Sequence, residues 1–195
     1  MPTDVGNRFS TKPVDKFSHQ PRLYALTREI SAGQSYDDDV VFAAVWLHDL
    51  GVFWGHRPET LAELAKWDSV AYVMKRTPDL LRQFGFSTAK ISAVVEAIRT
   101  HQPQENPASL EGVIVRDADI LEQLGATGIL RTVGKLGRDT RFPIFPVVLR
   151  VLQKNLDTLP GLLRLKKSKL LAEPCVAALW SFLEAAEKER CEMAA

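Results

Sequence analysis

The sequence has few cysteines, no long apolar run and almost no net charge. Cys175 and Cys191 are the two cysteines among 195 residues, and their spacing fits neither a disulfide framework nor a metal-binding motif. No apolar run is long enough to span a bilayer, and the polar N-terminus lacks the apolar segment of a signal peptide. We therefore expect a soluble, cytoplasmic protein with reduced thiols.

The charges of the chain are balanced. Lys and Arg total 25, and Asp and Glu total 24, so there is no basic or acidic surplus. This balance gives no electrostatic signature of nucleic-acid binding or of binding to a membrane surface. We expect a small-molecule partner, and the sequence leaves the oligomeric state open.

Strand-like alternation, internal repeats and a glycine-rich phosphate loop are also missing. Apolar residues instead recur at helical spacing, which predicts an all-α fold. The length of 195 residues suits one compact helical bundle, and 46% hydrophobic residues are typical of a globular protein. Because residues 1–16 are polar and contain two prolines, we expect an N-terminal arm there and a single helical domain at 17–195.

The most apolar segment runs from Val40 to Leu47 and ends in two ionisable residues, His48 and Asp49. Aspartates precede this segment and Gly51 follows it, as expected for a helix that is buried on most sides. Burying an imidazole and a carboxylate without partners costs roughly several kcal/mol, so hydrogen bonds or a metal ion must compensate them. This demand makes the pair the first candidate for a functional site.

Two further histidines lie at the ends of predicted apolar stripes. The residues that share helical spacing with His19 are Leu23, Leu26 and Ile30, and those that share it with His101 are Ile91, Val94 and Ile98. An isolated histidine in such a position is ordinarily a core or capping residue. The repetition of the pattern instead favours a shared site.

The predicted helix from Leu110 to Leu124 offers two aspartates, Asp117 and Asp119. Helical spacing places Asp117 on the apolar stripe. Two imidazoles and two carboxylates would form a mixed nitrogen and oxygen site that suits Mn, Fe, Co, Ni, Zn or, less well, Mg. The donor types alone do not select the ion.

In chain order, His19, the pair His48 and Asp49, His101, and Asp119 each lie on a predicted helix. This ordered set resembles the HD superfamily of metal-dependent phosphohydrolases, in particular its small stand-alone bacterial members. The resemblance covers a motif core at about residues 19–131, including the run RDADILEQLGATGILR, and C-terminal helices are expected at 145–190.

The resemblance implies a helical domain that binds a divalent cation through His19, His48, Asp49 and Asp119. Helical spacing favours Asp117 as the last ligand, whereas the family pattern favours Asp119. We follow the family pattern, because the predicted start of the helix can be wrong by a few residues and helical spacing depends on it. Asp117 then becomes a candidate for activating water, with a capping role as its alternative.

The resemblance also implies hydrolysis of a phosphoester or phosphoanhydride bond in a nucleotide or another small phosphorylated metabolite, with a metal-activated water as nucleophile. We expect Asp49 to bind metal and to accept the water's proton, and His101 to contact a phosphate or leaving group. Arg22 is a second candidate for phosphate binding. Extra histidines hold a second ion in some relatives, and His56 and His101 are the candidates for that role here.

Two alternatives stay open at this point. A non-catalytic domain that binds metal or nucleotide would keep the same ligands. A di-iron oxygenase on the same scaffold would need two irons and further ligands. The sequence specifies neither the substrate nor the number of ions.

Overall fold

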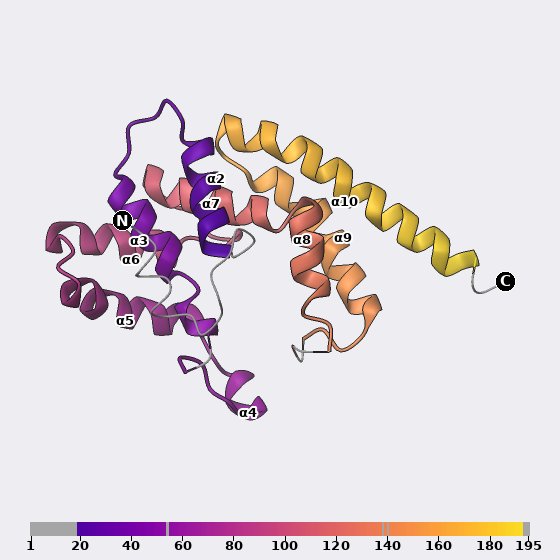
Figure 1. Cartoon of the computed structure of the whole chain (residues 1–195), viewed down its shortest axis with the longest axis horizontal. Coiled ribbons are helices and arrows are strands. Elements are labelled where there is room, and N and C mark those ends of the chain that lie inside the picture. The colour runs from indigo at the N-terminus through magenta and orange to yellow at the C-terminus, as the bar shows by residue number, and fades with distance from the viewer. Residues whose placement is uncertain (1–18, 54, 138, 140, 193–195) are drawn as a thin grey trace. The chain divides into compact units, whose positions relative to one another are not determined.

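The computed structural model describes residues 19–53, 55–137, 139 and 141–192 (Figure 1). The arm predicted at residues 1–16 lies outside these described residues. Within them every regular element is a helix and no strand occurs, which confirms the all-α prediction. None of the helices in this part of the chain combines the length and the apolar character that a membrane span needs.

The chain forms two compact units, one ending at Arg116 and the other beginning at Asp117. The single domain expected at 17–195 stays a prediction. The helices that lie wholly within the first unit are α2 (His19–Ile30), α3 (Asp38–Leu47), η1 (Leu50–Val52), α4 (Leu61–Leu64), α5 (Ser69–Gln83), η2 (Thr88–Lys90) and α6 (Ile91–Arg99). Helix α3 packs against α2 and α6, and α5 packs against α6 and η1.

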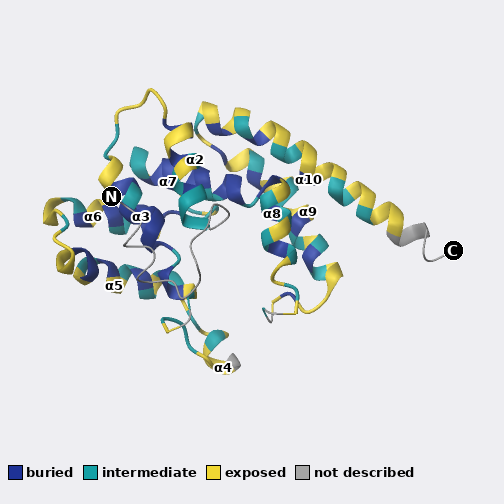
Figure 2. Ribbon diagram, viewed as in Figure 1, coloured by how far each residue is buried: buried dark blue, intermediate teal, exposed yellow. Residues whose placement is uncertain are grey.

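Helix α3 is the core element of the first unit, as the sequence predicts. Asp37 caps its N-terminus, where the side chain accepts a hydrogen bond of 3.1 Å from the backbone N–H of Asp39. Seven of the ten residues of α3 are buried (Figure 2). The helix delivers His48 directly after its last residue, and the backbone N–H of His48 still donates to the carbonyl of Ala44 at 2.9 Å.

Helix α5 differs from the prediction. The sequence predicts one helix from Glu59 to Met74 and a break at Thr77 and Pro78, whereas α4 and α5 are separate helices and α5 runs through Pro78. Pro78 has no N–H to donate to the preceding turn. The helix nevertheless continues because four side chains on one face are buried: Val73, Thr77, Leu80 and Leu81.

The second unit contains the end of α7 (Leu110–Glu122), together with α8 (Gly125–Val133), α9 (Phe145–Leu162) and α10 (Lys166–Glu192). Helices α8, α9 and α10 pack against one another. Gly125 makes the turn between α7 and α8 with a φ of 66°, a conformation that favours glycine. The sequence predicts a helix from Val147 to Leu159 that Pro160 ends, and this end is wrong, because α9 continues through the proline.

Candidate metal centre

Three of the predicted ligands converge in the first unit. His19 begins α2, while His48 and Asp49 follow α3, and these two helices pack together. The Nε2 atoms of His19 and His48 lie 3.2 Å apart. Asp49 Oδ2 lies 3.4 Å from His48 Nε2 and 3.6 Å from His19 Nε2. Among the described residues, this is the group of donor atoms that is close enough to hold a metal ion.

The spacing of these three donor atoms fits a divalent cation. Nitrogen and oxygen ligands bind such ions at about 2.1 Å, which separates neighbouring ligand atoms by roughly 3.0 to 3.4 Å. The three measured separations of 3.2, 3.4 and 3.6 Å lie at or slightly above this range. The chemistry of the donor set, two imidazoles and one carboxylate, suits the same group of ions.

Backbone hydrogen bonding orients the imidazole of His48. Its Nδ1 lies 2.9 Å from the carbonyl oxygen of Val45, and because a carbonyl only accepts, Nδ1–H is the donor. In the neutral ring, Nε2 is then left with a lone pair, and this is the nitrogen that faces His19 and Asp49. A metal-binding histidine is usually oriented in this way, by a hydrogen bond from the ring nitrogen that does not bind the metal.

His101 lies beside His48 and is buried, with 6% of its surface exposed. Their ring centroids are 5.0 Å apart in an edge-to-face arrangement. The Nδ1 of His101 lies 2.5 Å from the carbonyl oxygen of Ile98, the same backbone contact that His48 makes. The structure thus brings the last histidine of the predicted set to the edge of the cluster.

Asp49 carries a negative charge in this setting. Burial alone would raise the pKa of its carboxyl group, but when the neighbouring imidazoles are protonated, the charge and hydrogen bond of His48 and the charges of His19 and His101 hold that pKa well below its usual range. The Asp49 side chain is 29% exposed, against 13% for His19 and 1% for His48. The ionised carboxylate is therefore the most accessible of the three donors.

The two aspartates of α7 beyond Arg116 belong to the second unit. The buried carboxylate of Asp117 accepts hydrogen bonds from the backbone N–H groups of Arg164, at 3.0 and 3.2 Å, and of Leu165, at 2.8 Å. These contacts favour the capping role.

Asp119 is half-buried, and its Oδ2 accepts a hydrogen bond of 3.1 Å from Gln123. Its role as a metal ligand stays a prediction.

The remaining candidates lie elsewhere in the first unit. Arg22 lines a surface hollow on α2 with Pro21, Ala25, Leu26 and Glu29. His56 makes a hydrogen bond of 3.0 Å between its Nδ1 and the hydroxyl of Tyr72. A role for either residue in binding phosphate or a second ion stays a prediction.

Sequence reasoning missed two features of this site. The carbonyl oxygens that orient His48 and His101 each come from the residue three positions earlier, a relation that the helical pattern contains. The second feature is the contact of Tyr72 with His56, which no sequence pattern indicates. The sequence marks Tyr72 as a buried position of a helix, whereas it is half-buried and bonded to His56.

Solved structures share this fold. A protein of Lactobacillus plantarum is 20% identical and has a TM-score of 0.73, and the match covers 98% of this chain and 100% of that one. A predicted HD superfamily hydrolase from an uncultured Thermotogales bacterium is 22% identical, with a TM-score of 0.63 and coverages of 95% and 89%. YpgQ of Bacillus subtilis, in complex with ADP, is 19% identical, with a TM-score of 0.66 and coverages of 97% and 97%. At these identities the likeness shows the fold alone.

A comparison with curated proteins gave no significant match. The family model of the HD domain matches residues 17–124, which is more than half of the chain. The matched segment contains His19, His48, Asp49 and Asp119, and it includes the three side chains whose donor atoms converge. The chain belongs to the HD domain family.

Proposed function

We propose that this protein is a divalent-metal-dependent phosphohydrolase that acts on a nucleotide or another small phosphorylated metabolite. The observation that carries the proposal is the cluster of His19, His48 and Asp49, whose donor atoms lie 3.2 to 3.6 Å apart. A predicted HD superfamily hydrolase from an uncultured Thermotogales bacterium shares the fold, and YpgQ, which also shares it, was crystallised with ADP. The ADP complex of YpgQ supports a phosphorylated substrate, and the name of the Thermotogales protein supports a hydrolytic reaction.

In this proposal His19, His48 and Asp49 hold the cation, and Asp119 is the fourth ligand. A bound divalent ion supplies charge that polarises a phosphoryl oxygen and lowers the pKa of a bound water. The Nδ1–H bond to Val45 keeps Nε2 of His48 available as a donor atom.

Asp49 has a second role in the proposal as the acceptor of the proton from the attacking water. Its side chain is the most exposed of the three candidate ligands, so it is the donor that solvent reaches most readily. His101 lies next to His48 with its Nδ1 bonded to the Ile98 carbonyl, and in the proposal its Nε2 contacts a phosphate or leaving group.

The test is a hydrolysis screen on the purified protein with added Mn, Mg, Ni or Co. The substrates are nucleoside triphosphates, phosphodiesters and phosphomonoesters. We expect turnover of at least one class, and we expect His101→Gln to lower kcat at least tenfold while the bound ion is retained. A fully metal-loaded protein that hydrolyses none of these substrates contradicts the proposal.

A further inference from the structure

The short helix η1, which follows Asp49, is held against the start of α5. The indole N–H of Trp67 donates a hydrogen bond of 2.8 Å to the carbonyl oxygen of Gly51. A Cβ atom at Gly51 would lie only 2.6 Å from the carbonyl oxygen of Ser69, so the two backbones approach closely. Helix α5 therefore begins beside the segment that carries the two central ligands.

Tyr72 of α5 contacts the loop that follows η1. Its hydroxyl lies 3.0 Å from Nδ1 of His56, and the two rings meet edge to face with centroids 6.0 Å apart. On its other side the ring of Tyr72 packs against Trp67 at a centroid distance of 5.1 Å. Both Tyr72 and His56 are half-buried, so their polar groups are held in place and remain partly accessible.

Arg76 lies one helical turn after Tyr72, and therefore on the same face of α5. It is exposed, and no carboxylate of the described residues pairs with it. Burial and the positive charge of Arg76 lower the pKa of His56, so the guanidinium and the imidazole interact electrostatically.

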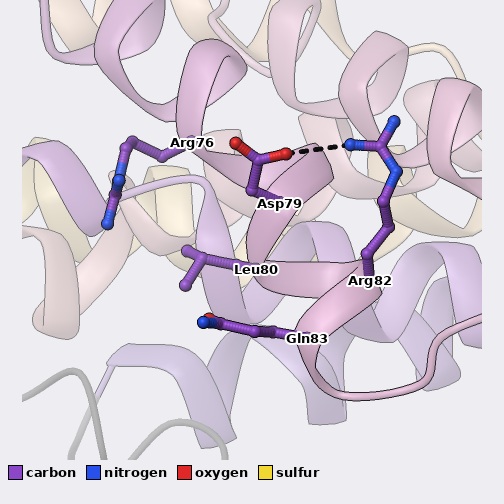
Figure 3. Close-up of a pocket in the computed structure, with 5 residues that line it drawn as sticks. All are labelled: Arg76, Asp79, Leu80, Arg82 and Gln83. Atoms are coloured by element: carbon purple, nitrogen blue, oxygen red, sulfur yellow. Dashed lines mark hydrogen bonds and ion pairs between the residues drawn. The ribbon is translucent and has the colours of Figure 1, made fainter.

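A second arginine of the same helix offers a contrast. Arg82 Nη1 lies 2.9 Å from Asp79 Oδ1, and Figure 3 shows the guanidinium of Arg76 directed away from that carboxylate. The two arginines border one surface hollow, which Asp79, Leu80 and Gln83 also line. One cation of this hollow is thus neutralised, and the other is available to a ligand.

We propose that Arg76, Tyr72 and His56 form an anion subsite that binds a phosphoryl group of the substrate other than the one attacked. The guanidinium supplies charge. Because one proton of the His56–Tyr72 pair is used in the hydrogen bond between them, the pair supplies one further donor, from either the hydroxyl or the imidazole, and charge with a neutral donor is a combination that recognises a phosphate. The substrate class that fits has two or more phosphoryl groups, as in a nucleoside diphosphate or triphosphate. This inference rests on the proposed function and narrows its substrate class to compounds with two or more phosphoryl groups.

The test measures binding of inorganic pyrophosphate by calorimetry in the presence of EDTA, so that neither metal nor turnover is required. We expect Arg76→Gln to weaken binding about tenfold and Tyr72→Phe to weaken it several-fold. Arg82→Gln is the matched control, because Arg82 is exposed on the same helix and borders the same hollow, and we expect less than a twofold change. Circular dichroism checks that each variant is folded.

Two outcomes overturn the subsite. One is wild-type protein that does not bind pyrophosphate. The other is equal binding by wild type and Arg76→Gln, or an equal loss in Arg76→Gln and Arg82→Gln, which would reflect net charge alone. Hydrolysis by the wild-type enzyme is measured separately. A protein that hydrolyses only monoesters keeps the proposed function and loses the subsite.

Discussion

At the scale of single residues, each histidine of the α3 and α6 termini is oriented by a carbonyl of its own chain. His48 is held by Val45 and His101 by Ile98, three residues earlier in each case. A histidine directly after an apolar helix can make this bond without any other side chain. This explains why such histidines can present Nε2 to a ligand from a buried position.

Replacing Asp117 tests whether this residue caps backbone N–H groups or activates the attacking water. Asp117→Ala removes the acceptor for the backbone N–H groups of Arg164 and Leu165 and leaves them unpaired. We expect the free energy of unfolding in urea to fall by about 3 kcal/mol, with the bound metal retained. The exposed Asp157→Ala serves as control and should change stability by less than about 0.5 kcal/mol. Unchanged stability with lost turnover would favour the water-activating role instead.

At the scale of elements, the sequence predicts the helices better than their ends. The apolar run of Val40 to Leu47 and the stripe that ends at His101 both correspond to buried helices. The helix containing Pro78 was not predictable, because its continuation depends on the burial of Thr77 and Leu81 rather than on local preference. The contact of Tyr72 with His56 was equally hidden, because it joins a loop to a helix 16 residues away.

Gly51 tests the close approach of the ligand-bearing segment to α5. In Gly51→Ala the new Cβ would lie 2.6 Å from a backbone carbonyl oxygen, which cannot move aside as a flexible side chain can. We expect a loss of about 1–3 kcal/mol in the free energy of unfolding and a weaker affinity for the metal ion. Gly161→Ala is the control, because nothing lies within 4 Å of its added Cβ. Equal stability of the two variants would refute the tight packing.

The pKa of Tyr24 reports on the contact between α2 and the start of α3. Partial burial and a hydrogen bond of 2.7 Å to Asp38 Oδ2 raise the pKa of Tyr24 to about 12. Because the folded-state pKa is raised, the stabilisation is fully present below the unfolded pKa of about 10 and is lost as the pH rises through the folded value.

Ultraviolet titration of tyrosinate measures this shift. We expect the difference between wild type and Tyr24→Phe to show one group that ionises near pH 12. Ionisation of this group near the value of a free tyrosine, about 10, would show that the contact is absent in solution.

At the scale of the whole molecule, the candidate site is built from distant parts of the sequence. His19 and His48 are 29 positions apart, and their Nε2 atoms lie 3.2 Å from each other. The order of the candidate ligands His19, His48 and Asp49 was visible in the sequence because they lie at the ends of apolar helices. The choice between Asp117 and Asp119 could not be made from the sequence, because helical spacing favours Asp117 and the family pattern favours Asp119.

Binding of the ion should stabilise the folded chain as a whole. A ligand that binds only the folded state adds about 2.7 kcal/mol when its free concentration is one hundred times its Kd. We therefore expect Mn to raise the melting temperature of metal-free protein and EDTA to reverse the increase, measured by calorimetry. His48→Gln should show neither change, since it lacks one of the three converging donors. An equal increase in wild type and variant would indicate binding elsewhere.

The central claim is that His19, His48 and Asp49 form the metal centre of a hydrolase. Metal content by mass spectrometry, measured on wild type and on Asp49→Ala and paired with the hydrolysis screen, tests it most directly. We predict that bound metal and turnover are lost together in Asp49→Ala, while Asp79→Ala, an exposed control, keeps both. Metal retained by Asp49→Ala, or two irons per wild-type chain without hydrolysis, would contradict the claim, and the second result would favour an oxygenase.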